Sequence, residues 1–369
     1  MKVGIIINYN LSEQESVGHM DVLMAMFNNL LTMFEEVHVF SMHDSRADYN
    51  LGKGIFVHPM PGNGILGMFR NALLARKIIR REKIGVIRVM ATTKSAFVAE
   101  FATLFMKVPI ILSVHVHRTL YQKQSGIALN PAYNFFVELW ERAALWRADL
   151  VPVISYFIRD YVAGLGASPS KITLHRNFVD TGLFVQDRKP HKGMRMVFVS
   201  RLVGAKGVDI LLQSFKIANK KHPELELYVA GDGPDKPNLE ELSRKLGISN
   251  KVKFLGAVKH EKLPELFGEC DFFAAASQAG FVLNEALSCG LPVLAADIEW
   301  TKEIISDTVG VLVPFGSAEV FAEGIGKMVS RRAEWPEMGR AGRELAVKEL
   351  SIESYKKREL ELYKKVLHL

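Results

Sequence analysis

Residues 199–215 read VSRLVGAKGVDILLQSF, and this stretch changes its pattern twice within a few residues. A hydrophobic strand pattern ends at Arg201, a short turn containing two glycines follows, and a helical pattern then begins. Lys206 stands between the two glycines. Because residues five apart do not share a helix face, the turn has to bring the two cations together. Guanidinium and ammonium groups gathered at a strand end are either surface cations around a glycine turn or a site for an anion such as a phosphate, and the loops described below favour the anion site.

The same alternation of strand and helix patterns runs through the whole chain. Near-continuous apolar strands separated by helices predict α/β architecture, with parallel sheets covered on both faces. The expected strands are 3–7, 36–41, 54–58, 85–90, 109–115 and 150–155 in the first half, and 194–200, 225–231, 252–256, 270–277, 291–297 and 309–314 in the second.

A polar, proline-bearing segment at residues 185–194 separates two such series and reads as a linker. We therefore predict two doubly wound, Rossmann-like domains that face each other across a cleft, with domains at 1–186 and 187–349. Residues 350–369 form a charged helix that we expect to pack back toward the first domain. Ligands of such sheets bind outside the carboxyl ends of the strands.

Composition narrows the class of protein. Hydrophobic residues make up 49% and charged residues 24%, which excludes global disorder. The only two cysteines, Cys270 and Cys289, together with the lack of a signal-peptide core, favour a cytoplasmic protein. The net charge is +7, and residues 1–190 hold 21 basic and 15 acidic residues, so the basic excess belongs to the first half. This asymmetry indicates a local anionic partner there.

Two further loops follow strands of the second half. Gly231 and Gly233 form a tight turn that would let a ligand approach the backbone. At residues 277–293 a strand end leads through Gly280 into a helix beginning near Phe281, and the start of a helix attracts anions. Glu285, one turn inside that helix, could accept hydrogen bonds from ribose hydroxyls, or could simply favour the helix dipole.

Taken together, these motifs and their order resemble glycosyltransferase family 4 over nearly the whole chain. In the second half the motifs are SRLVGAKG (200–207), GDGP (231–234), FLGAV (254–258), FVLNEALSCGLPVLA (281–295), EII (303–305) and GVLVP (310–314). In the first half they are SVGHMDVLMAMFNNL (16–30), ILSVH (111–115), ADLVPVIS (148–155) and ASPSKITLHRNFVDTGLF (167–184). Single motifs are weak, whereas this many in order are specific.

The resemblance implies the two-domain GT-B fold and transfer of a sugar from a nucleotide donor with retention of configuration. The first domain would then serve the acceptor and the second the nucleotide sugar. By resemblance, Arg201 and Lys206 bind the donor diphosphate, and His115 lies near the transferred sugar. The sequence contains no Asp-X-Asp pair, so no metal cofactor is expected.

The remaining donor contacts also follow from the resemblance. Glu285 matches the second glutamate of the family's paired-glutamate motif and would hold the ribose. Gly18 would let the backbone approach the diphosphate from the first domain, and Gly280, Phe281 and Val282 would form the loop around the donor.

Two positions depart from the family pattern. Ser277 stands where the first glutamate of the pair is expected, and Phe178 replaces the glycine of the usual Asn-Gly-Val-Asp run. The first departure leaves open a non-catalytic relative that binds sugar nucleotides or glycans. Another GT-B enzyme, such as a sugar-nucleotide epimerase, is a further alternative.

The basic excess of the first half is concentrated in one predicted helix, residues 66–83. Its six cations fall within less than half of the helix circumference: Arg70, Arg76, Lys77, Arg80, Arg81 and Lys83. They form either a solvated face or a surface for anionic lipid headgroups or an anionic acceptor, which would place the protein peripherally on the inner face of the cell membrane. The aromatic stripe at 131–148 suits the core equally well. No nucleic-acid motif accompanies the charge, so we expect no nucleic-acid partner.

Overall fold

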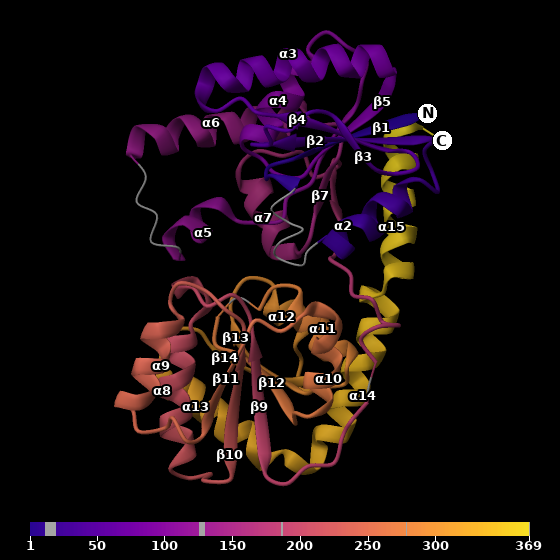
Figure 1. Ribbon diagram of the computed structural model, residues 1–369. Helices are drawn as coiled ribbons and strands as arrows, with labels where there is room; N and C mark the ends of the chain where they lie inside the picture. Colours follow the sequence, from indigo (N-terminus) through magenta and orange to yellow (C-terminus); the bar gives the residue numbers. More distant parts are fainter. Residues whose placement is uncertain (12–19, 125–129, 186, 278, 369) are drawn as a thin grey trace. The chain divides into compact units, whose positions relative to one another are not determined.

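The computed structural model describes residues 1–11, 20–124, 130–185, 187–277 and 279–368, and the chain divides into two compact units (Figure 1). Unit 1 combines Met1–Tyr121, Ala128–Arg176 and Lys356–Leu369, and unit 2 combines Gln122–Ile127 and Asn177–Tyr355. The predicted boundary at 186/187 lies ten residues after the start of the long segment of unit 2. The intervening residues pack on unit 2, where the Val179 N–H donates to the Leu350 carbonyl and Phe184 is buried.

Unit 1 is built on a six-stranded sheet with the order β3-β4-β2-β1-β5-β6, in which only β3 is antiparallel to its neighbour. The strands are β1 (Lys2–Ile7), β2 (Glu36–Met42), β3 (Tyr49–Gly52), β4 (Ile55–Met60), β5 (Ile84–Val89) and β6 (Ile110–Leu112). A short parallel pair, β7 (Val151–Val153) and β8 (Ile172–Leu174), extends this edge through isolated bridges from Ile111 and Val114.

Helices cover both faces of this sheet. One face packs against α3 (Gly64–Glu82), α4 (Lys94–Thr103), α6 (Pro131–Arg147) and α7 (Tyr156–Gly164). The other face packs against α2 (Met20–Leu30) and the end of α15 (Ile352–Leu367). A short helix, α5 (Arg118–Gln124), follows β6. The last helix thus supplies part of the core of unit 1, through side chains such as Leu362 and Tyr363.

A buried ionic cluster fixes that helix to unit 1. Arg88, on β5, pairs with Glu359 of α15 and also donates to Ser113 Oγ at 3.0 Å. His175 Nε2 lies 2.7 Å from the second carboxylate oxygen of Glu359. Arg88 and Glu359 are almost completely excluded from solvent, so each charge depends on its partners for compensation.

Unit 2 has a six-stranded, wholly parallel sheet with the order β11-β10-β9-β12-β13-β14. Its strands are β9 (Met194–Val199), β10 (Leu225–Ala230), β11 (Val252–Gly256), β12 (Phe272–Ala275), β13 (Val293–Asp297) and β14 (Gly310–Pro314). One face packs on α8 (Val208–Asn219), α9 (Lys236–Lys245), α13 (Ala318–Ser330) and the first residues of α14 (Trp335–Leu345). The other face packs on α10 (Leu263–Gly268), α11 (Val282–Ser288), α12 (Thr301–Ile304) and a π-helical turn, η4 (Ala346–Leu350).

The prediction of two doubly wound domains is therefore confirmed. In unit 2, β9 and β12 lie side by side although they are the first and fourth strands of the sheet. In unit 1, β1 and β5 lie side by side although they are the first and fifth. At such a point the connections leave in opposite directions, which opens the crevice that ligands use in this kind of sheet.

Replacing Glu359 with Ala should destabilise unit 1, because it leaves the Arg88 guanidinium buried without its carboxylate. We expect a loss of about 3–5 kcal/mol in the free energy of unfolding, measured by denaturant titration. Glu361→Ala is the matched control on the same helix, since Glu361 is exposed and pairs across one turn with Lys364. Equal stability of the two variants would contradict the role given to this cluster.

Candidate functional site

The loop after β9 carries both cations that the sequence singled out. It contains a 3₁₀ turn, η1 (Gly204–Lys206), and Gly207, with a φ of 64°, leads from it into α8. Arg201 is exposed, whereas Lys206 is half-buried. Burial lowers the pKa of Lys206, the Glu299 carboxylate opposes that shift, and the positive charge of Arg201 adds to it. The two cations are thus close enough to influence each other electrostatically.

The glycine turn after β10 supports this loop from behind. The Leu202 N–H donates to the Asp232 carbonyl at 2.9 Å, and the Asp235 N–H donates to the Leu202 carbonyl at 3.2 Å. A Cβ atom at Gly233 would lie 2.4 Å from the Leu202 carbonyl oxygen, and one at Gly231 would lie 1.8 Å from the Ser200 carbonyl oxygen. The sequence suggested that these glycines admit a ligand, but in the structure they admit the backbone of the loop after β9.

Ser277, two residues after the end of β12, contacts the same loop. Its side chain is buried, and its Oγ donates to the Ala205 carbonyl at 2.9 Å. A Cβ atom at Gly207 would lie 3.1 Å from the Ser277 Cβ, so the two loops are closely packed. The structure therefore brings Arg201, Lys206 and Ser277 together at the point where β9 and β12 are neighbours.

The rest of the predicted donor loop leads into α11. Gly280 has a φ of 64° and open space where a Cβ would stand, and Phe281 is exposed. Val282, partly exposed, is the first residue of the helix.

Glu285 is buried within α11 and is held from one side. Its Oε1 lies 2.9 Å from His260 Nε2, whereas its Oε2 is buried and has no hydrogen-bond partner among the described residues. Buried carboxylate oxygens are normally paired, so Oε2 is suited to accept a hydrogen bond from a ligand hydroxyl.

His260 was not predicted as a site residue. It belongs to a 3₁₀ turn after β11, η2 (His260–Lys262), and Phe184 contacts its ring edge to face at 5.1 Å between centroids. The only signal in the sequence was its place four residues after Gly256, just past a strand end.

The predicted residues of unit 1 lie apart in the sequence from this group. His115 follows β6 and is partly exposed, and Gly18 lies outside the described residues. Also in unit 1, the buried carboxylate of Glu141 accepts hydrogen bonds from Thr92 Oγ1 and Arg118 Nε, each at 2.6 Å. This cluster ties α6 to the segments that follow β5 and β6.

One group of potential metal ligands occurs within the described ranges, and it lies elsewhere. Glu36, His38 and Glu82 gather where β1 and β2 begin, opposite the carboxyl edge of the sheet. The Lys2 ammonium lies 2.6 Å from one glutamate and 3.4 Å from the other. An internal cation thus already compensates these carboxylates.

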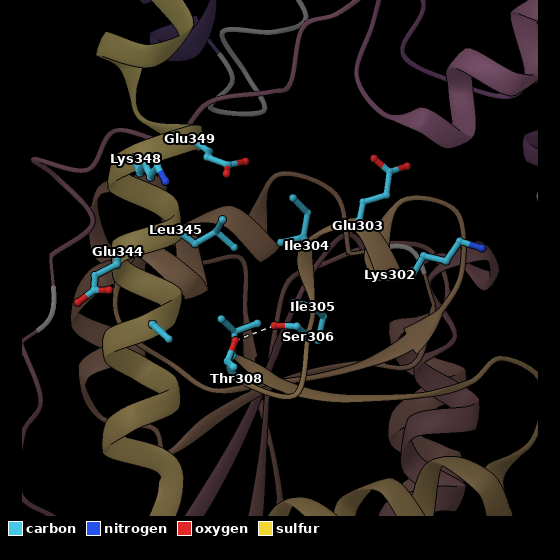
Figure 2. A pocket seen from close by; sticks show the side chains of 12 residues that line it. Lys302, Glu303, Ile304, Ile305, Ser306, Thr308, Glu344, Leu345, Lys348 and Glu349 are labelled. Atoms are coloured by element: carbon cyan, nitrogen blue, oxygen red, sulfur yellow. Dashed lines mark hydrogen bonds between the residues drawn. The ribbon is translucent and has the colours of Figure 1, made fainter.

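A cavity of about 420 Å³ opens in unit 2 beside α12 and the end of α14 (Figure 2). Lys302, Glu303, Lys348 and Glu349 line it, so its wall carries both signs of charge. None of the predicted donor residues is part of its lining, and it does not extend the site.

Comparison with known proteins assigns the two halves to two adjoining family models. "Glycosyltransferase Family 4" matches residues 23–183, and "Glycosyl transferases group 1" matches residues 181–345. Together they span both compact units apart from the two ends of the chain.

Curated relatives carry the names of glycosyltransferases. A phosphatidylinositol N-acetylglucosaminyltransferase chain of Arabidopsis thaliana is 28% identical over 65% of this chain. The match spans only about half (53%) of that relative's length. The alpha-monoglucosyldiacylglycerol synthase of Streptococcus pneumoniae is 23% identical over 80% of this chain and 69% of its own.

Solved structures share the fold over nearly the full length. A sucrose-phosphate synthase from Thermosynechococcus elongatus superposes with a TM-score of 0.84 at 17% identity, covering 100% of this chain and 99% of its own. Anabaena HepE in complex with UDP gives 0.76 at 18% identity, covering 98% and 99%. With both halves matched by their models and the fold shared end to end, the chain belongs to the family 4 glycosyltransferases of GT-B fold.

Proposed function

We propose that the protein is a retaining glycosyltransferase that moves a sugar from a nucleotide-sugar donor to a hydroxyl group of a lipid or glycan, without a metal ion. The observation that carries this proposal is the pair Arg201 and Lys206, held at the junction of β9 and β12 by the glycine turn and by Ser277. Two fixed cations at a ligand-binding strand edge suit a diphosphate.

The chemistry assigned to these residues is electrostatic. When the bond between the sugar and the diphosphate breaks, negative charge develops on the leaving phosphate oxygen. Arg201 and Lys206 stabilise that charge from positions fixed before the reaction begins, which lowers the barrier. No side chain among the described residues stands out as a covalent nucleophile, so we propose that the acceptor oxygen attacks from the face that the leaving group vacates. By resemblance to the family, we propose that His115 also contacts the transferred sugar.

Glu285 and Ser277 are assigned to the donor. The buried Oε2 of Glu285 accepts from a ribose hydroxyl, while His260 fixes the other oxygen. Ser277 replaces a carboxylate that would contact sugar hydroxyls, so the choice of sugar is where this chain should differ from its relatives. Support for a nucleotide donor comes from HepE, which was solved with UDP.

We propose a lipid-linked or glycan acceptor because relatives are named for phosphatidylinositol and diacylglycerol substrates. Among the described residues no helix is long and apolar enough to cross a membrane. From the names of these relatives we also propose a cytoplasmic location, peripherally on the inner face of the cell membrane.

Arg201→Ala and Lys206→Ala should each weaken binding of nucleoside diphosphates about tenfold or more, since a charge-assisted hydrogen bond contributes roughly 1.5–3 kcal/mol. Isothermal titration calorimetry with UDP, GDP and ADP measures the loss and identifies the preferred base. Lys220→Ala, at the exposed end of α8, is the control. Unchanged affinity in both site variants would mean that this loop does not bind the diphosphate.

His260→Ala should lower the affinity for the same nucleotide about fivefold, because the hydrogen bond that orients Glu285 is worth roughly 1 kcal/mol. Glu285→Ala should lose at least as much. Lys262→Ala, on the same 3₁₀ turn but exposed, should bind as the parent does. If Glu285→Ala binds normally, the ribose assignment fails regardless of His260.

Ser277→Ala should change the ratio of kcat/KM values among donors that share one nucleotide but differ in the sugar. The affinity for the free nucleoside diphosphate should stay within a few-fold of the parent. Identical ratios in an active enzyme would mean that residue 277 does not help to select the sugar. Absence of turnover with every donor tested would instead favour the non-catalytic relative.

A further inference from the structure

Large apolar side chains are unusually exposed on the outer side of α3, α4 and α6, three helices that cover one face of the sheet in unit 1. Of the 23 exposed large hydrophobic residues in the described ranges, 12 lie here: Ile65, Leu66, Phe69, Leu73 and Leu74 on α3, Leu104 and Phe105 after α4, and Tyr133, Phe135, Phe136, Leu139 and Trp146 on α6. Leu66 is 86% exposed, Phe105 94% and Trp146 77%. Apolar residues gathered on one layer in this way mark an interaction surface, unlike single ones scattered elsewhere. We call this surface the α3–α6 face.

An aromatic cluster makes the α3–α6 face continuous. Phe69 of α3 contacts Phe97 and Phe101 of α4, with centroids 4.9 and 5.1 Å apart. Both α4 rings contact Trp140 of α6, at 4.7 and 5.8 Å. The three helices are therefore joined by rings that are themselves partly exposed, and Figure 1 shows α3, α4 and α6 as neighbours in unit 1.

α6 carries large apolar side chains on two opposite sides. Ala144 and Leu145 face the core, while Phe135, Leu139 and Trp146 face outward. A helix on the surface of a soluble protein normally has a polar outer face, whereas these apolar side chains share the exposed surface of α6 with the Glu138–Arg142 ion pair. The aromatic stripe at residues 131–148, which the sequence alone would allow in the core, is thus divided between the core and the exposed surface.

The turn after α4 holds Phe105 outward at a conformational cost. Its φ is 60°, in the left-handed region that bulky residues rarely occupy. Arg76 of α3 donates to the carbonyls of Ala102 and Leu104, at 3.0 and 2.6 Å, and so fixes this turn. Arg76 therefore serves the fold, although the sequence grouped it with the cations available to a partner.

Cations flank the apolar part of the face. Along α3 the exposed arc is apolar at Leu66 and Leu73 and becomes basic at Lys77 and Arg80, all within about 60° of one another at roughly 100° per residue. Residues 64–83 contain six basic residues and one acidic residue, Glu82. Like charge disfavours pairing of two such faces, whereas apolar groups bordered by cations fit an anionic bilayer.

We propose that the α3–α6 face docks on an anionic lipid bilayer. Leu66, Phe105 and Trp146 enter the boundary between headgroups and acyl chains, while Lys77 and Arg80 meet lipid phosphates. Docking of this face deepens the proposed function, because it would bring a lipid acceptor to the enzyme. It rests on the proposed function in that respect alone.

Flotation of the full-length chain with vesicles tests the surface. We expect vesicles of phosphatidylcholine with phosphatidylglycerol to bind at least tenfold more protein than phosphatidylcholine alone. Changing Leu66, Phe105 and Trp146 together to Ser should reduce this binding at least tenfold, as should changing Lys77 and Arg80 to Glu. The controls are Phe315→Ser with Val347→Ser, and Arg244→Glu with Lys245→Glu, all at exposed positions of unit 2.

Insertion of Trp146 into the bilayer can be measured separately, by its fluorescence. Brominated lipids should quench the fluorescence of the bound parent protein, and Trp146→Phe should remove most of that quenching. Failure of the parent to bind anionic vesicles, or full binding by the apolar triple variant, overturns the proposal. Self-association in ultracentrifugation that the same triple variant abolishes would assign the face to a second copy instead.

Nucleotide affinity separates this inference from the proposed function. The variants of the α3–α6 face should bind nucleoside diphosphate as the parent does, because none of their changed residues is assigned to the donor. Vesicle binding without any nucleotide binding by the parent would refute the donor site and leave the docking surface standing.

Discussion

The order in which the parallel strands pair determines where chemistry can occur in this molecule. Because β9 pairs with both β10 and β12, the chain leaves the middle of the unit 2 sheet in two directions, and the loops after β9 and β12 meet across the gap. The cations lie in one loop and Ser277 in the other. Arg201, Lys206 and Ser277 therefore lie close together because the topology of the sheet makes their two loops neighbours.

Packing then gives the loops a fixed geometry. The glycine turn fills the space behind Leu202 with backbone, and Ser277 bonds the Ala205 carbonyl in front. Lys206 is partly withdrawn from water, which lowers its pKa and strengthens its interaction with any anion that excludes the remaining solvent. Fixed dipoles and charges of this kind are effective because they need little reorganisation when charge develops.

The sequence predicted the elements that depend on local pattern, and failed where tertiary context decides. The apolar strands and the loop containing Arg201 and Lys206 were predicted correctly, because hydrophobic periodicity and residue spacing determine them locally. His260 was missed, since nothing local shows that a histidine after one strand will meet a glutamate on a helix after another. The glycines at 231 and 233 were read as space for a ligand, although the nearest neighbour is the chain itself. The weak strands β3 and β8 were also missed, since their pairing rather than their pattern makes them strands.

The return of the chain to unit 1 has a consequence for biosynthesis. Residues 356–368 leave the ribosome only after all of unit 2 has been made, yet Glu359 compensates Arg88 in the middle of unit 1. Until then the nascent first half lacks the carboxylate that compensates Arg88 on β5, and it lacks the cover supplied by Leu362 and Tyr363. Unit 2 contains no late segment of this kind among its described residues. The half that begins synthesis first is therefore the one that completes folding last, and a nascent chain arrested before residue 356 would display an unfinished first domain to chaperones.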